Sequence, residues 1–99
     1  METGIEIIAK ERKRQIEEEG YTSENDDKEF YDDLSDAAAI YAMNKGDRTL
    51  MIEDGDSIIN TIWPWDIKYY KPTNNRIHEL AKAGALIAAE IDKLLRLKK

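Results

Sequence analysis

Residues 74–99, NNRIHELAKAGALIAAEIDKLLRLKK, constrain the fold more than any other part of the chain, because their apolar positions recur with the period of an α-helix. The recurring positions form one continuous stripe, with Leu95 beside it: Ile77, Leu80, Gly84, Ile87, Ile91 and Leu94. Pro72 and Thr73 precede this stretch and are typical of a helix boundary. We predict one long helix at this end of the chain.

A second helix is predicted from about Gly4 to Glu19. Thr3 has the side chain of a helix N-cap, and Glu6, three residues later, completes a capping box. Gly20 ends the periodic pattern. The apolar stripe of this helix consists of Ile5, Ile8, Ala9 and Ile16.

Arg12 falls inside that apolar stripe, where a guanidinium group requires a bidentate acceptor. Glu19 is two turns away on the same helix, so the acceptors that the sequence offers are Glu90, Asp33 or the segment 63–66. A structural ion pair is the favoured interpretation, and a catalytic arginine is the alternative.

A third helix is predicted over residues 29–44, EFYDDLSDAAAIYAMN. Its apolar face consists of Phe30, Leu34, Ala37, Ala38 and Tyr41, and the small alanines favour close packing against another helix. Asp54 and Gly55, between TLMI and SIINTI, have the pattern of a hairpin turn. A loop or a short helix over the core competes with this hairpin.

These elements predict a mainly α fold: a single compact three-helix domain, residues 1–99, with a loop or short β-hairpin excursion between the second and third helices. A symmetric bundle would need a fourth helix. A second copy of the chain would cover any apolar surface that remains, so we expect a homodimer.

Composition narrows the function classes. The 99 residues include no cysteine, which excludes disulfides, thiolate metal clusters and cysteine nucleophiles. The formal net charge of -6 opposes binding to nucleic-acid phosphates. No apolar run is long enough to cross a membrane, and the N-terminus lacks the order of a secretory signal, so we expect a soluble cytoplasmic protein.

The segment DDLSD places Asp32, Asp33 and Asp36 within one helical turn, where carboxylates three and four residues apart share a face. Such a group repels itself unless a cation is present, and Mg²⁺ prefers oxygen ligands of this kind. The competing interpretation is that these acids only face water and the helix macrodipole. Glu90 or Glu19 could add a ligand from a facing helix, whereas His78 is expected on the surface.

The segment TIWPWDIKYYKP, residues 61–72, holds half of the chain's eight aromatic residues between or beside two prolines. Trp63 and Trp65 are expected to bury their rings over the helices as a lid. The alternative is a platform on which a nucleobase stacks, since Lys68, Lys71 and Arg76 are interleaved with the aromatic residues.

The pattern ERKRQIEEEGYT, DD, WPWD, YYKP and KAGALIAAEIDKL, read in chain order, resembles a family of small bacterial and prophage-encoded proteins. Such proteins are distantly similar to the MazG-type all-α nucleoside triphosphate pyrophosphohydrolases, which hold Mg²⁺ with an E-E-x-x-E set and a later E-x-x-D set. Asp32, Asp33 and Asp36 match the first spacing with Asp replacing every Glu. The later set is not found, because ELAK places Lys82 at the position of its final acid.

This resemblance implies a Mg²⁺-dependent nucleotide pyrophosphohydrolase and assigns roles to three groups of residues. The ion would be held by Asp32, Asp33 and Asp36. The catalytic residues would be Asp33, Glu90 and Arg12, and the nucleotide would contact Trp63, Trp65 and Lys82. The alternative is a non-catalytic interaction protein whose acidic surface, residues 17–36, binds a basic partner or mimics nucleic acid.

Overall fold

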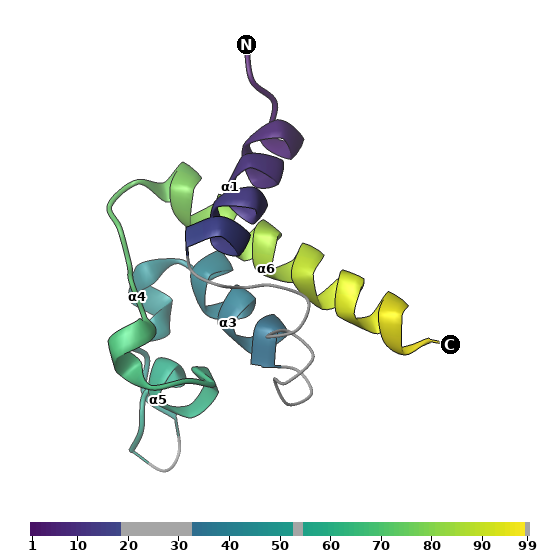
Figure 1. Ribbon diagram of the computed structural model, residues 1–99. Helices are drawn as coiled ribbons and strands as arrows, with labels where there is room; N and C mark the ends of the chain where they lie inside the picture. Colours follow the sequence, from purple (N-terminus) through teal and green to yellow (C-terminus); the bar gives the residue numbers. More distant parts are fainter. Residues whose placement is uncertain (19–32, 53–54, 99) are drawn as a thin grey trace.

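The computed structural model of the protein describes residues 1–18, 33–52 and 55–98, and the regular elements in these ranges are helices (Figure 1). In chain order they are α1 (Gly4–Glu18), α3 (Asp33–Ala42), α4 (Lys45–Arg48), α5 (Ile58–Ile62), the 3-10 helix η1 (Ile67–Tyr69) and α6 (Arg76–Leu97). The mainly α prediction is therefore confirmed. The predicted number of three helices is too low even for these ranges, because α4 and α5 lie in the excursion.

The predicted capping box at the start of α1 is present. The Thr3 hydroxyl accepts a hydrogen bond from the Glu6 amide at 3.3 Å, and the Thr3 amide donates to the Glu6 carboxylate at 3.1 Å. At the other end of the chain Asn75 caps α6, because its side chain accepts a hydrogen bond from the His78 amide at 3.1 Å. Local side-chain chemistry thus sets the start of both long helices.

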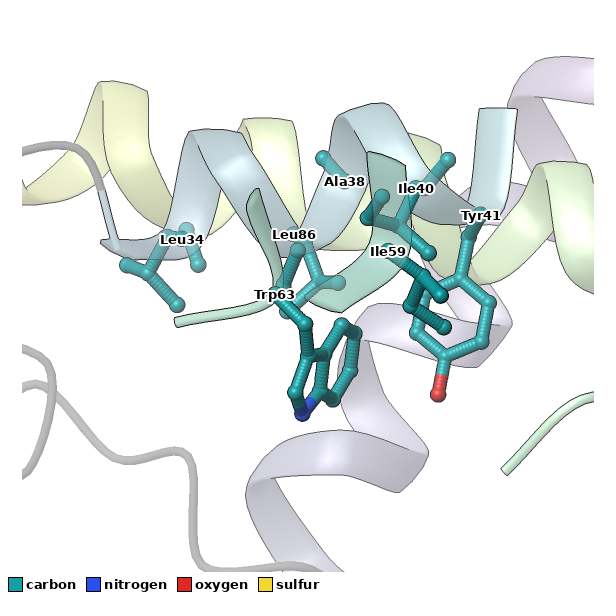
Figure 2. Close-up of a cluster of buried hydrophobic side chains, with 10 residues drawn as sticks. Leu34, Ala38, Ile40, Tyr41, Ile59, Trp63 and Leu86 are labelled. Atoms are coloured by element: carbon teal, nitrogen blue, oxygen red, sulfur yellow. The ribbon is translucent and has the colours of Figure 1, made fainter. Parts of the chain in front are cut away.

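Helix α3 packs along the first two thirds of α6 in the antiparallel sense. The guanidinium of Arg76, at the start of α6, donates to the carbonyl of Tyr41, near the end of α3, at 2.9 Å. The core between the helices is drawn in Figure 2 and is built from residues of α3, α5, α6 and the segment that follows α5. Its buried members are Leu34, Ala37, Ala38, Ile40, Tyr41, Ile59, Trp63, Ala83, Leu86 and Ala89.

Helix α1 crosses α6 at Gly84 (Figure 1). A Cβ atom at this position would lie 2.6 Å from Cδ1 of Ile8, so the missing side chain is what lets the two helices approach. The buried residues of α1 are polar: Glu11 and Gln15, whereas Ile5 is 82% exposed. Of the predicted apolar stripe of α1, Ile8 packs against α6, whereas Ile5 and Ile16 are exposed, so the prediction holds only in part.

The excursion between α3 and α6 contains short helices and one isolated antiparallel bridge. Met51 and Ser57 form the bridge, and Gly55 adopts a positive φ of 78° in the turn between them. Within the described part of this segment the two predicted strands do not extend beyond that bridge. Ser57 instead caps α5 by accepting a hydrogen bond from the Asn60 amide at 3.2 Å.

Several predicted features fall outside the described residues. They include the start of the helix predicted over residues 29–44, namely residues 29–32 with Phe30 and Asp32. Glu19, Asp54 and most of the acidic stretch 17–36 also lie outside. Among the helices that the structure describes, none combines the length and apolar character needed to span a membrane.

Candidate functional site: the faces of helix α6

Helix α6 buries charged residues and exposes aliphatic ones. Its buried charged residues are Glu79, Lys82, Glu90 and Lys93, which are between 1% and 9% exposed. Its exposed aliphatic residues include Ile77, Leu80, Ile87, Ile91 and Leu94, which are between 46% and 66% exposed. An apolar stripe on a surface helix normally faces the core. Each buried charge therefore needs a specific partner, and the stripe needs a separate explanation.

Glu79 is held by Arg48 in a buried, two-pronged ion pair. Arg48 Nη2 donates to Glu79 Oε1 at 3.0 Å, and Arg48 Nη1 donates to Glu79 Oε2 at 3.1 Å. The same guanidinium donates to the Met43 carbonyl at 2.7 Å and to the Tyr70 hydroxyl at 2.9 Å. This pair therefore ties α4 and the end of α3 to the first turn of α6.

The surroundings shift the pKa values of both partners toward their charged forms. Burial acts to raise the pKa of Glu79, but the hydrogen bonds from Arg48 and from the Thr73 amide outweigh it, so this pKa lies below its usual range. Burial acts to lower the pKa of Arg48, but its bonds to Glu79 and Tyr70 raise this pKa overall. Both groups remain ionised at neutral pH.

Lys82 contacts the backbone of the segment that precedes α6. Its ammonium donates to the Lys71 carbonyl at 2.9 Å and lies 5.1 Å from the centre of the Tyr41 ring. The Tyr41 hydroxyl in turn accepts a hydrogen bond from the Lys71 amide at 2.9 Å. Two side chains thus fix the backbone of Lys71, and this arrangement gives Lys82 a role in the fold.

Glu90 and Lys93 form a second buried charged pair on α6. Lys93 Nζ lies 3.7 Å from Glu90 Oε1, which is an ion-pair distance but too long for a hydrogen bond. Neither Lys93 Nζ nor the other carboxylate oxygen, Glu90 Oε2, has a hydrogen-bond partner in the structure. This pair is therefore less well satisfied than Arg48 and Glu79.

Arg12 forms an ion pair with Asp92 of α6. The nearest atoms, Nη2 and Oδ2, are 3.9 Å apart, and the arginine side chain is 14% exposed. Asp92 was not among the acceptors expected from the sequence. The residue directly before Arg12, the buried Glu11, accepts hydrogen bonds from Arg14 at 2.6 and 2.8 Å.

His78 of α6, expected on the surface, has a side chain that is 42% exposed, and its Nε2 lies 3.5 Å from Oε1 of Glu11. Burial acts to raise the pKa of Glu11, but the hydrogen bond and charge of Arg14, with the charges of His78 and Lys82, lower it overall. The α1 and α6 contact is therefore held by charge pairing at its rim and by Ile8 at its centre.

The predicted metal ligands lie at the start of α3. Asp33 and Asp36 are both half-buried in its first turn, and Asp32 lies outside the described residues. Among the residues that the structure does describe, no three acidic or histidine side chains are grouped as a metal site. The expected catalytic residues stand on three helices, with Arg12 on α1, Asp33 on α3 and Glu90 on α6.

Trp63 is part of the core. Its ring meets those of Tyr41, Trp65 and Tyr70 edge to face, with centres 5.6, 5.5 and 5.3 Å apart, and its indole N–H donates to the Asp66 carbonyl at 3.2 Å. Trp65 is half-buried against the cluster. Trp63 therefore has no open ring face of the kind that a stacked base requires.

The exposed aliphatic residues occupy a third face of α6, distinct from the faces that contact α1 and α3. We call Ile77, Leu80, Ile87, Ile91 and Leu94 the free face. A shallow apolar cleft of about 180 Å³ continues it onto α1, where Gly4, Ile7 and Ile8 line the side opposite Ile77 and Leu80. The sequence did contain this stripe, but its period alone could not tell which side of the helix would face solvent.

A comparison of the chain with protein families, curated proteins and solved structures finds no match.

Proposed function

We propose that the protein is a non-catalytic interaction protein that binds another polypeptide through the free face of α6. The observation that carries this proposal is the inverted burial of that helix: five aliphatic side chains are about half exposed or more, while four charged side chains on the same helix are buried. A patch of this size is comparable to the largest apolar patch on a typical monomeric protein, and such a patch is often an interaction site.

The geometry of the free face suits a helical partner. Its residues are separated by three and four positions in alternation when Gly84 is included, which is the spacing along which two helices pack side by side. The binding energy would come from burial of apolar surface. Binding by the acidic stretch 17–36, the alternative considered from the sequence, would instead come from attraction between opposite charges. Binding by apolar burial persists at high salt, whereas binding between opposite charges weakens.

Site-specific crosslinking tests this proposal in cells that produce the protein. A photoreactive phenylalanine analogue at Ile87, in the centre of the free face, should give an adduct of defined mass. The same analogue at Ala39, which is exposed on α3, is the matched control and should give none. Absence of an adduct at Ile87, or equal adducts at both positions, would contradict the proposal.

A second candidate function is the Mg²⁺-dependent nucleotide pyrophosphohydrolase that the resemblance implies for this bacterial and prophage-type chain. The observation that favours it is the level of Glu90 on α6. Tyr41 of α3 lies beside Lys82 of α6, and these two helices are antiparallel. The first turn of α3 begins eight residues before Tyr41, which corresponds to a position about eight residues after Lys82 on α6. By this count Glu90 is expected near the level of Asp33, and one of its carboxylate oxygens has no hydrogen-bond partner.

In this second candidate Asp32, Asp33 and Asp36 would hold the ion, which would supply charge neutralisation of the phosphates and an activated water. Asp33 with Glu90 and Arg12 would be the catalytic residues. Trp65 is better placed than Trp63 to contact a base, because it is less buried. Lys82 would act on the nucleotide only after releasing the Lys71 carbonyl.

The measurement for the second candidate is Mg²⁺-dependent release of pyrophosphate across a panel of NTPs and dNTPs. Asp36→Asn should abolish the release, and Asp47→Asn, on the exposed surface of α4, should preserve it. If the wild-type protein releases no pyrophosphate from any nucleotide, or if both variants behave alike, this candidate function is wrong.

A further inference from the structure

We infer that the partner on the free face of α6 is a second copy of this chain, which packs its own α6 against the first about a two-fold axis. This inference rests on the proposed function, because it assigns the occupant of the same surface. Three properties of the free face, its area, its length and its charge environment, support that assignment.

The area of the free face matches the apolar part of a stable interface. Five half-exposed aliphatic side chains present on the order of 400 Å² of apolar surface per copy. A standard interface buries about 800 Å² from each partner, of which a little more than half is apolar. The polar part of the buried surface would come from residues around the free face. A second copy could therefore form an interface of standard size with no apolar surface beyond the free face.

The length of the free face requires a long partner helix. From Ile77 to Leu94 the stripe runs for about 26 Å along the axis, at 1.5 Å per residue. A partner must present an apolar stripe of equal length and equal spacing to fill it. Another α6 does so by definition, and in a two-fold arrangement each residue of the stripe serves both subunits.

Helix α1 leaves room for this packing. It meets α6 through Ile8 at Gly84, the one position of the stripe that has no side chain. Leu80 and Ile87, one turn before and one turn after the crossing, are still 46% and 48% exposed. The third face of α6 is therefore accessible along its length, with α1 on one flank and α3 on the other.

The charge of the chain predicts how such a dimer responds to salt. Each copy has a formal net charge of -6, so two copies repel one another at long range. Salt screens this repulsion and does not weaken apolar contact. The dimer should thus become tighter as ionic strength rises, which is opposite to the behaviour of a complex held by the acidic surface.

The test is the mass of the purified protein by sedimentation equilibrium or light scattering, over a concentration series and at two salt concentrations. The wild-type protein should have twice the 11.4 kDa mass of one chain. Ile87→Asp and Ile87→Lys should each reduce the mass to that of the monomer with unchanged helical circular dichroism. Ile67→Asp, at an exposed isoleucine on η1 outside the free face, is the control and should remain dimeric.

Mixing Ile87→Asp with Ile87→Lys supplies a readout that misfolding cannot imitate. In a two-fold dimer the two positions face each other closely enough for the opposite charges to pair, so the mixture should recover the dimer mass that each variant alone has lost. A wild-type monomer at about 100 µM, where even micromolar association would show, overturns the inference, as does dissociation of the Ile67→Asp control.

The outcome also separates this inference from the proposed function. A crosslink at Ile87 between two copies supports both statements. A crosslink to a different protein, together with a monomeric purified chain, overturns the second-copy inference and leaves the interaction function standing. No crosslink at Ile87 together with a monomeric chain overturns both.

Discussion

Arg48 and Glu79, 31 positions apart in the sequence, face each other inside the protein with two hydrogen bonds between guanidinium and carboxylate. Each side chain is only 1% exposed. Arg48 also donates to the Tyr41 and Met43 carbonyls, where α3 ends, and to the Tyr70 hydroxyl. Glu79 also accepts a hydrogen bond from the Thr73 amide at 3.2 Å. Through these partners the charged pair joins α4, the end of α3 and the first turn of α6.

Loss of one partner from this pair should be costly. Arg48→Met leaves Glu79 buried without its counter-charge, and we expect a decrease of about 3–5 kcal/mol in the free energy of unfolding. The double variant Arg48→Met with Glu79→Leu should recover part of that loss, because no unpaired charge remains. Urea unfolding of both variants measures the difference. Equal stability of wild type and Arg48→Met would contradict this account.

Acid should destabilise the protein through the same pair. The pKa of Glu79 in the folded state lies below the ordinary value of 4.5, so the unfolded chain takes up this proton first as the pH falls. The stabilisation by Glu79 is therefore fully present above about pH 4.5 and is lost as the pH falls toward the lower folded pKa. Glu11 contributes in the same direction. Thermal unfolding between pH 7 and pH 3 should show a shallower acid loss in Glu79→Gln than in the wild type.

Gly84→Ala should destabilise the protein although alanine favours helices. The gain in helix propensity is about 1 kcal/mol. The new Cβ would lie 2.6 Å from Cδ1 and 2.9 Å from Cγ1 of Ile8, so α1 must shift or Ile8 must change its rotamer. We expect a net loss of about 1 kcal/mol from this overpacking. Adding Ile8→Ala should remove the clash, and a double-mutant cycle measured by urea unfolding gives the coupling.

The pair of Glu90 and Lys93 should respond differently from Arg48 and Glu79. Lys93→Met alone leaves a buried carboxylate unpaired, and we expect a loss of about 3 kcal/mol. Replacing both residues, as Glu90→Leu with Lys93→Met, should be neutral or stabilising by about 1–2 kcal/mol, because two poorly hydrogen-bonded charges are removed. Melting temperatures of the single and double variants test this order, and a double variant less stable than Lys93→Met would refute it.

Local signals in the sequence were sufficient to predict where the long helices lie, but not which of their faces are buried. Thr3, Glu6 and the period of residues 77–94 predict α1 and α6 because capping and periodicity involve near neighbours only. Burial of Glu79 depends on Arg48, and burial of Lys82 depends on the Lys71 carbonyl. These partners are distant in sequence, and nothing near Arg48 marks it as anything other than a turn residue. Without knowledge of these pairs, the hydrophobic stripe is interpreted as the inward face.

The candidate site was predictable to a smaller extent. The sequence indicated that Trp63 belongs over the helices, and the structure places it in the core against Tyr41. Arg12 was recognised as needing an acid, but Asp92 was missed because its distance from Arg12 depends on where α1 crosses α6. That crossing is set by Gly84 and Ile8, a contact across the whole chain.

The inverted burial of α6 separates two properties that most helices combine. The charges on the inner side are buried, and Glu79 and Lys82 bond to other parts of the fold, whereas the aliphatic residues of the free face are about half exposed or more. The two sets share no residue. If the free face is the binding surface proposed above, substitutions there would change which partner the protein binds with less effect on its stability than substitutions of the buried charges.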